Sequence, residues 1–158
     1  AQRVRMANIA QMINVLQAMI LTDNEKMLLT PTYHLFRMYV PFQDAKLVPL
    51  KLDAGEWRQG QIRLPRLDAI AAKDAAGRLI VSVTNIDPEH PATLDVNVAG
   101  ATWTAVAAQT LTGEKVDSIN TFEAPDAVAP KPLAATLDAG HLRATLPPRS
   151  VSVFTLSP

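Results

Sequence analysis

The chain has 158 residues, of which 48% are apolar and 19% charged, and its 15 basic and 15 acidic side chains leave no formal net charge. A chain this apolar can bury a core, which excludes wholesale disorder, and a neutral chain lacks the basic field that holds nucleic acid or an anionic membrane. The absence of cysteine excludes disulfide scaffolds, thiolate metal sites and cysteine nucleophiles.

The chain divides near residue 45 into two regimes of composition. All methionines and tyrosines lie in residues 1–44, where apolar side chains recur with helical spacing. Residues 3–9 fit either a short buried strand or a helical turn, and residues 12–21 have the spacing of a helix. The second of these segments is too short and too polar to cross a bilayer.

The clearest helix is predicted over residues 31–39. Thr30 can cap its N-terminus, and Pro31 would occupy the first helical position, where the missing N–H group costs nothing. Pro41 ends the helix, because proline disfavours helical backbone in the residue before it.

From residue 45 onward the apolar period becomes two. The alternating runs lie at residues 79–84, 93–98, 103–111, 142–146 and 151–154, with turn signals such as Asp87-Pro88 and Thr112-Gly113 between them. Short strands at this spacing, with no helical pattern between them, predict an antiparallel β-sandwich over residues 45–158.

Residues taken alone reveal no self-sufficient active site. The histidines, His34, His90 and His141, have no metal-ligand spacing and are expected to be surface or core side chains. Ser150 and Ser152 lie in a predicted strand, without the G-x-S-x-G turn that exposes a nucleophile. We therefore expect neither a metal nor a cofactor.

Two pairs of carboxylates lie close together in loop-like sequence. They are Asp53 with Glu56 and Glu123 with Asp126. Catalytic carboxylates need raised or contrasting pKa values, usually at rigid strand ends of a cleft. Both pairs are therefore expected to be solvated surface groups.

Four stretches are specific enough to compare with a known family. They are V-R-M-A-N-I-A-Q-M-I-N-V-L-Q at residues 4–17, L-T-P-T-Y-H-L-F-R-M-Y at 29–39, N-T-F-E-A-P-D-A-V at 120–128 and L-P-P-R-S-V at 146–151. In this order they resemble the α-L-arabinofuranosidases of glycoside hydrolase family 51, and the first two are the most specific.

The resemblance implies a mainly β fold in two parts. Residues 1–44 would be the final strand and helix of a (β/α)8 barrel, and residues 45–158 a C-terminal antiparallel β-sandwich of the jelly-roll type. Residues 3–9 would then be the eighth barrel strand. Ala1 would lie at a boundary with a preceding segment.

The resemblance also implies a reaction. Family members are retaining hydrolases that remove terminal non-reducing α-L-arabinofuranosyl residues from arabinan- and arabinoxylan-type glycans. Their acid/base and nucleophile glutamates lie on earlier barrel strands, so the resemblance assigns no catalytic residue to this chain. The complete protein would be the enzyme.

Gln11 is the one substrate-binding residue that the resemblance places here. It aligns with a family glutamine beyond the eighth strand that hydrogen-bonds the arabinofuranosyl unit. A side-chain amide can donate to and accept from sugar hydroxyls without adding charge near the catalytic carboxylates, and barrel active sites lie at the C-terminal strand ends. Asn8 and Asn14 are expected to bond backbone in the loop, and Tyr33 and His34 to pack or cap the helix.

The implied partners are the missing N-terminal catalytic-barrel segment and an arabinofuranosyl oligosaccharide or polysaccharide. We also expect a cytoplasmic homo-oligomer with no nucleic acid or membrane partner. The alternative is a non-catalytic β-sandwich that binds carbohydrate or is purely structural. A carbohydrate-binding module usually presents a row of exposed aromatics, and Trp57 and Trp103 are the only tryptophans available for one.

Overall fold

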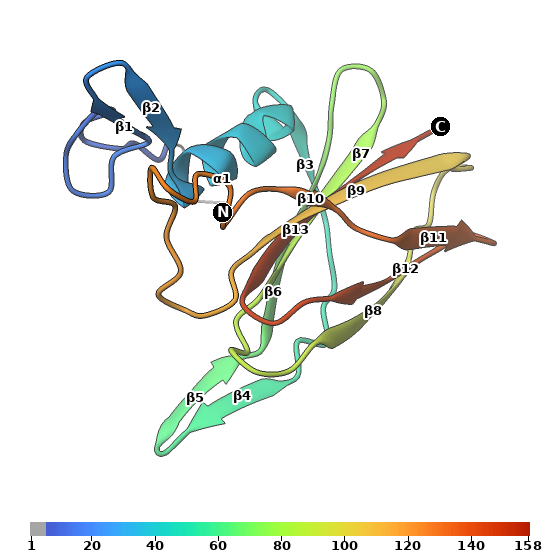
Figure 1. The fold of residues 1–158 in the computed structure, drawn as a ribbon. Helices are drawn as coiled ribbons and strands as arrows, with labels where there is room; N and C mark the ends of the chain where they lie inside the picture. The colour runs from blue at the N-terminus through green and yellow to red at the C-terminus, as the bar shows by residue number, and fades with distance from the viewer. Residues whose placement is uncertain (1–5) are drawn as a thin grey trace.

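A six-stranded antiparallel sheet forms the centre of the computed structural model, which describes residues 6–158 (Figure 1). Its strand order is β10-β9-β13-β7-β6-β3. The strands are β3 (Lys46–Val48), β6 (Leu67–Lys73), β7 (Leu79–Asn85), β9 (Ala105–Thr112), β10 (Lys131–Pro132) and β13 (Ser150–Ser157). The last strand of the chain, β13, lies inside the sheet and pairs along its length with both β7 and β9.

A three-stranded antiparallel sheet packs against this one. Its strands, in spatial order, are β11 (Ala135–Asp138), β12 (His141–Leu146) and β8 (Ala92–Asn97). Leu142 and Leu146 of β12 are fully buried, whereas Arg143 and Thr145 between them are exposed. Alternate side chains of a strand point to opposite faces, so the period of two places one face in the core. The predicted antiparallel β-sandwich is confirmed, and no helix interrupts residues 78–156.

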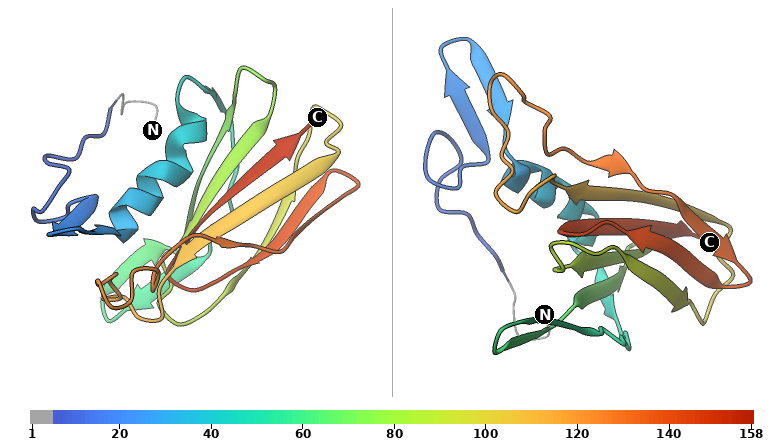
Figure 2. Two further views of the ribbon diagram at one scale, coloured as in Figure 1. Left: turned by 45° about the horizontal axis from the view of Figure 1, so that its top comes forward. Right: turned by 60° about the horizontal axis from the view of Figure 1, so that its bottom comes forward.

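One helix covers the outer face of the six-stranded sheet. It is α1 (Pro31–Tyr39), continued by the 3-10 turn η1 (Val40–Phe42). The Thr30 hydroxyl accepts a hydrogen bond from the Tyr33 amide at 3.4 Å, and Pro31 begins the helix as predicted. The left view of Figure 2 shows the helix lying beside the sheet, opposite β8 and β12. The chain thus has three layers: helix, large sheet, small sheet.

Side chains at the end of α1 attach it to the large sheet. Met38 is 1% exposed and packs in a cluster with Ile80 and Val153 of β7 and β13. The Tyr39 hydroxyl lies 2.7 Å from the hydroxyl of Ser82, which is itself buried on β7. The helix is therefore held by apolar contact and a polar link across the same interface. None of the helices formed by residues 6–158 is long and apolar enough to span a membrane.

The prediction of a helix over residues 12–21 is wrong. The segment forms a loop that leads into a hairpin of β1 (Ile20–Asp23) and β2 (Lys26–Leu29). Asn14 and Gln17 have φ values of 54° and 61°, a left-handed conformation that cannot continue a right-handed helix. Apolar spacing over ten residues fits a helix locally, but the strand pairing within this hairpin overrides it.

The expected barrel strand does not appear in the part of residues 3–9 that the structure describes. Residues 6–9 have no regular secondary structure, and residues 3–5 lie outside the described part. A strand is stabilised by hydrogen bonds to neighbouring strands. In a barrel, both neighbours of this segment would come from sequence that the chain does not contain.

A second hairpin extends from the sandwich at the bottom of Figure 1. It pairs β4 (Glu56–Gln59) with β5 (Ile62–Pro65) and forms a two-stranded sheet of its own. Ile62 and Leu64 on β5 are 55% and 44% exposed. The apolar pattern of residues 56–65 does not predict this hairpin.

Candidate functional site

Gln11 lies in the irregular segment that precedes β1, and its side chain is exposed. The backbone of the next residue is fixed, because the Met12 carbonyl accepts hydrogen bonds from the amides of Met19 and Ile20, both at 3.0 Å. The segment therefore presents the Gln11 amide to solvent from a backbone that is anchored on its C-terminal side.

Asn14 organises the loop that follows. Its side chain accepts a hydrogen bond from the Thr22 amide at 2.7 Å and donates one to the Thr22 hydroxyl at 2.8 Å. Asparagine tolerates the left-handed conformation found here better than most residues. The expected structural role of Asn14 is confirmed. For the exposed Asn8, the structure of residues 6–158 shows no comparable bond.

Thr30 joins this loop to the helix. Its hydroxyl donates to the Ala18 carbonyl at 2.7 Å and approaches the Met19 carbonyl at 3.2 Å, while it accepts from the Tyr33 amide. Its own amide donates to the Met19 carbonyl at 3.0 Å. Ala18 is 2% exposed, so these bonds are shielded from water. The residue that caps α1 thus also fixes the loop after Gln11.

Asn120 connects the sandwich to the same region. It belongs to the long connection between β9 and β10, which runs beside β2 and α1 in the views of Figures 1 and 2. The Asn120 amide nitrogen donates to the Leu29 carbonyl at 2.9 Å and to the Val128 carbonyl at 3.0 Å. Its oxygen accepts from the Val128 amide at 2.7 Å. Residues 120–128 stand out in the sequence as a motif, but this bridging role is visible only in the structure.

The three histidines lie on different elements of the fold. His34 is buried in α1, and this burial lowers its pKa, although the charge of Asp126 acts in the opposite sense. His90 and His141 each approach an aspartate, at 3.2 Å and 2.9 Å. Among residues 6–158 no group of three histidines or carboxylates could hold a metal ion.

The two carboxylate pairs are on the surface, as expected. Asp53, Glu56, Glu123 and Asp126 are all exposed. The pKa of Glu123 is lowered, first by a hydrogen bond from its own backbone amide and then by the Thr121 hydroxyl. A general acid needs a raised pKa. Neither the exposure of these four carboxylates nor the lowered pKa of Glu123 therefore favours a catalytic acid among them.

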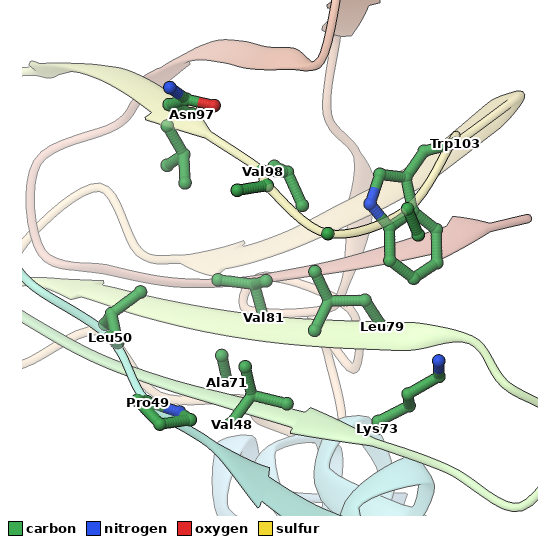
Figure 3. Close-up of a pocket in the computed structure, with 14 residues that line it drawn as sticks. Val48, Pro49, Leu50, Ala71, Lys73, Leu79, Val81, Asn97, Val98 and Trp103 are labelled. Carbon is green, nitrogen blue, oxygen red and sulfur yellow. The ribbon is translucent and has the colours of Figure 1, made fainter.

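The sandwich has a cavity of about 280 Å³ at its open side, between β3 and the connection from β8 to β9 (Figure 3). The residues labelled around it are mostly apolar and include Val48, Leu79, Val81 and Trp103. Sugar sites need several hydrogen-bonding groups directed at hydroxyls, and this lining offers few. Trp57 lies on the separate β4–β5 hairpin, so the two tryptophans do not form one stacking platform.

A buried carboxylate at the other end of the sandwich contributes to stability. Asp87 accepts hydrogen bonds from the amides of Glu89 and His90, both at 2.9 Å, and lies 3.3 Å from the Arg66 guanidinium. Burial raises the pKa of Asp87, but the two amides and the His90 ring together lower it below its usual value. The ionised form is therefore the one that the fold prefers.

We expect Asp87→Asn to reduce the free energy of unfolding by about 1–3 kcal/mol near neutral pH. The pKa of Asp87 is lower in the folded state than in the unfolded state. Its contribution to stability is therefore complete above about pH 3.9, the unfolded pKa, and is lost as the pH falls through the pKa of the folded state. Denaturant titrations near neutral pH and below about pH 3 check this. A stability difference that grows toward low pH would contradict it.

Comparisons with known proteins show which family of domains this chain resembles. A family model described as the α-L-arabinofuranosidase C-terminal domain matches residues 1–150. An intracellular exo-α-L-arabinofuranosidase of Bacteroides ovatus is 35% identical over 156 residues, which are 98% of this chain and 30% of that protein. The chain therefore spans less than a third of that relative's length.

Solved structures of family 51 enzymes are also similar to this chain. A family 51 arabinofuranosidase from Xanthomonas axonopodis pv. citri is 43% identical with a TM-score of 0.93, over 99% of this chain and 32% of that one. A family 51 α-L-arabinofuranosidase from Bifidobacterium longum is 26% identical with a TM-score of 0.83, over 99% and 31%. The chain belongs to the α-L-arabinofuranosidase C-terminal domain family and corresponds to the C-terminal part of glycoside hydrolase family 51 enzymes.

Proposed function

We propose that this chain is the C-terminal portion of a retaining α-L-arabinofuranosidase. The complete enzyme would hydrolyse terminal non-reducing α-L-arabinofuranosyl residues from arabinan- and arabinoxylan-type glycans. The observation that carries the proposal is the 35% identity, over 98% of this chain, to an exo-α-L-arabinofuranosidase. The remaining two thirds of such a protein would supply the catalytic barrel.

Residues 1–44 would complete that barrel, and residues 45–158 would form the sandwich attached to it. Exposed apolar side chains near the start of the described chain support this division. They are Met6, Met12, Ile13 and Leu16, with exposed fractions between 50% and 94%. Such a concentration of exposed apolar surface is typical of an interface. The missing barrel wall would cover it.

Catalysis would be divided between the two parts of the protein. Retaining hydrolysis uses a nucleophile and an acid/base whose carboxyl groups lie about 5 Å apart, and both would come from the barrel. Gln11 would add a neutral hydrogen-bonding group at the arabinofuranosyl unit. The exposure of its side chain and the anchored backbone beside it support this role.

The same proposal extends to location and assembly. The Bacteroides ovatus relative is an intracellular exo-α-L-arabinofuranosidase, which supports a cytoplasmic enzyme. The exposed apolar side chains of the β4–β5 hairpin support a homo-oligomer, because an isolated two-stranded hairpin is only marginally stable in water.

Product analysis by NMR with the full-length protein tests the proposal. Aryl α-L-arabinofuranoside should be hydrolysed with the α-anomer formed first, and arabinan and arabinoxylan oligosaccharides should release free arabinose. The matching aryl arabinopyranoside and xylopyranoside are the controls. Inversion at the anomeric carbon would refute the retaining mechanism, and hydrolysis of the controls alone would refute the substrate class.

A further inference from the structure

We propose that Asn120, in the sandwich, is a positioning residue for the substrate-binding segment that contains Gln11. It would act through the junction of β2 and α1 and through the loop over residues 12–19. This inference rests on the proposed function and adds a role for the sandwich in that reaction. The sandwich would support the active site directly as well as cover the barrel.

The first step is the bond between Asn120 and the end of β2. Asn120 is 5% exposed, and its amide nitrogen donates to the Leu29 carbonyl across 91 positions of sequence. The other bonds of the amide, to both backbone groups of Val128, hold its orientation. The bond is part-buried, and a carbonyl shielded from water is costly to leave without a donor, so this contact holds the backbone at Leu29.

The second step is Thr30, the next residue along the chain. Its backbone is placed by Leu29, and its hydroxyl and amide hold the carbonyls of Ala18 and Met19. The β1–β2 hairpin pairs with no other strand of the described chain. Bonds such as these, with the buried side chain of Leu28, therefore attach the loop to the rest of the fold.

The third step returns to Gln11. The amides of Met19 and Ile20 converge on the Met12 carbonyl, so a displacement of Met19 moves the residue that follows Gln11. Substrate contacts are sensitive to such displacements, since a misplacement of about 1 Å can reduce a rate roughly 100-fold. A change at Asn120 should therefore alter the reaction through the position of Gln11.

Asn85 offers a matched control. It is 1% exposed, and its amide also makes three hydrogen bonds: it donates to the carbonyls of His90 and Pro147 and accepts from the Asp87 amide. These partners lie at the turns of the sandwich and include none of the residues that lead to Gln11. Asn85→Ala therefore removes an equivalent buried amide without touching the proposed path.

The experiment measures kcat/KM of the full-length protein on aryl α-L-arabinofuranoside, well below the melting temperature of each variant. Asn120→Ala should lower kcat/KM by about 10- to 100-fold, whereas Asn85→Ala should leave it unchanged. Combined with Gln11→Ala, Asn120→Ala should cause a clearly smaller loss than alone, because both act on the same contact. Equal effects of the two asparagine variants, or an additive double variant, would overturn the inference.

Two further measurements keep the test decisive. If Asn120→Ala does not fold, Thr30→Val should lower kcat/KM and Thr30→Ser should retain it; equal values for these two would overturn the inference. Hydrogen exchange at the amides of Met19 and Ile20 should accelerate in Asn120→Ala but not in Asn85→Ala, and unchanged exchange would refute the link. This readout is independent of activity, so an inactive wild-type protein would refute the proposed function alone.

Discussion

Replacing Phe154 with alanine is expected to reduce the free energy of unfolding by about 3–5 kcal/mol. Phe154 is fully buried on β13 and belongs to the core cluster between the two sheets, together with Leu142 and Leu146 of β12. Removal of its ring leaves a cavity that both sheets border. Denaturant unfolding of the 158-residue chain, followed by circular dichroism, measures the loss.

A conservative variant at the same position is the control. Phe154→Leu keeps an apolar side chain in the core, so its cost should be clearly smaller than that of Phe154→Ala. Thr155→Ala changes the next residue of β13, whose side chain points to the opposite face. A loss below about 1 kcal/mol for Phe154→Ala would mean that the two sheets do not share this core.

The largest expected effect on activity concerns Gln11. In the full-length protein, Gln11→Ala should weaken transition-state binding by ~1–3 kcal/mol, a roughly five- to 150-fold loss in kcat/KM for arabinofuranosides. Gln11→Glu should be worse, because a third carboxylate would disturb the pKa separation of the catalytic pair. Steady-state kinetics measures both variants.

Folding should survive both changes, because an exposed polar side chain contributes little packing. Gln43→Ala is the control, since Gln43 is also an exposed glutamine, after η1, and no substrate contact is proposed for it. Unchanged kinetics in both Gln11 variants, with the melting temperature intact, would show that Gln11 is only a loop residue.

The sandwich could be predicted from sequence because the period of its strands reports directly which side chains face the core. Leu142 and Leu146 alternate with Arg143 and Thr145, and the structure buries the first two alone. The helix over residues 31–39 could also be predicted from sequence, because the residues that signal its N-terminus act within one turn. Both elements depend on local pattern.

The N-terminal part could not be predicted this way. The apolar spacing of residues 12–21 fits a helix, yet the pairing of β1 with β2 and the left-handed backbone at Asn14 determine the observed loop. A strand over residues 3–9 depends on neighbours that this chain does not supply. Local sequence cannot report either kind of partner.

The candidate site shows the same limit. Gln11 was identified only through resemblance to a family, because an exposed glutamine has no distinguishing local pattern. The role of Asn120 depends on a carbonyl 91 positions away, and nothing in residues 120–128 specifies it. The resemblance marked residues 120–128 as a motif, and the structure shows that Asn120 bonds to the end of β2.

The most direct test of the proposed function compares hydrolysis of aryl α-L-arabinofuranoside by the full-length protein and by the isolated 158-residue chain at equal molar concentration. We predict steady release of the aryl group by the full-length protein and none by the isolated chain, because the carboxylates that act on the substrate would lie in the preceding barrel. Hydrolysis by the isolated chain, or an inert full-length protein, would contradict the proposed function.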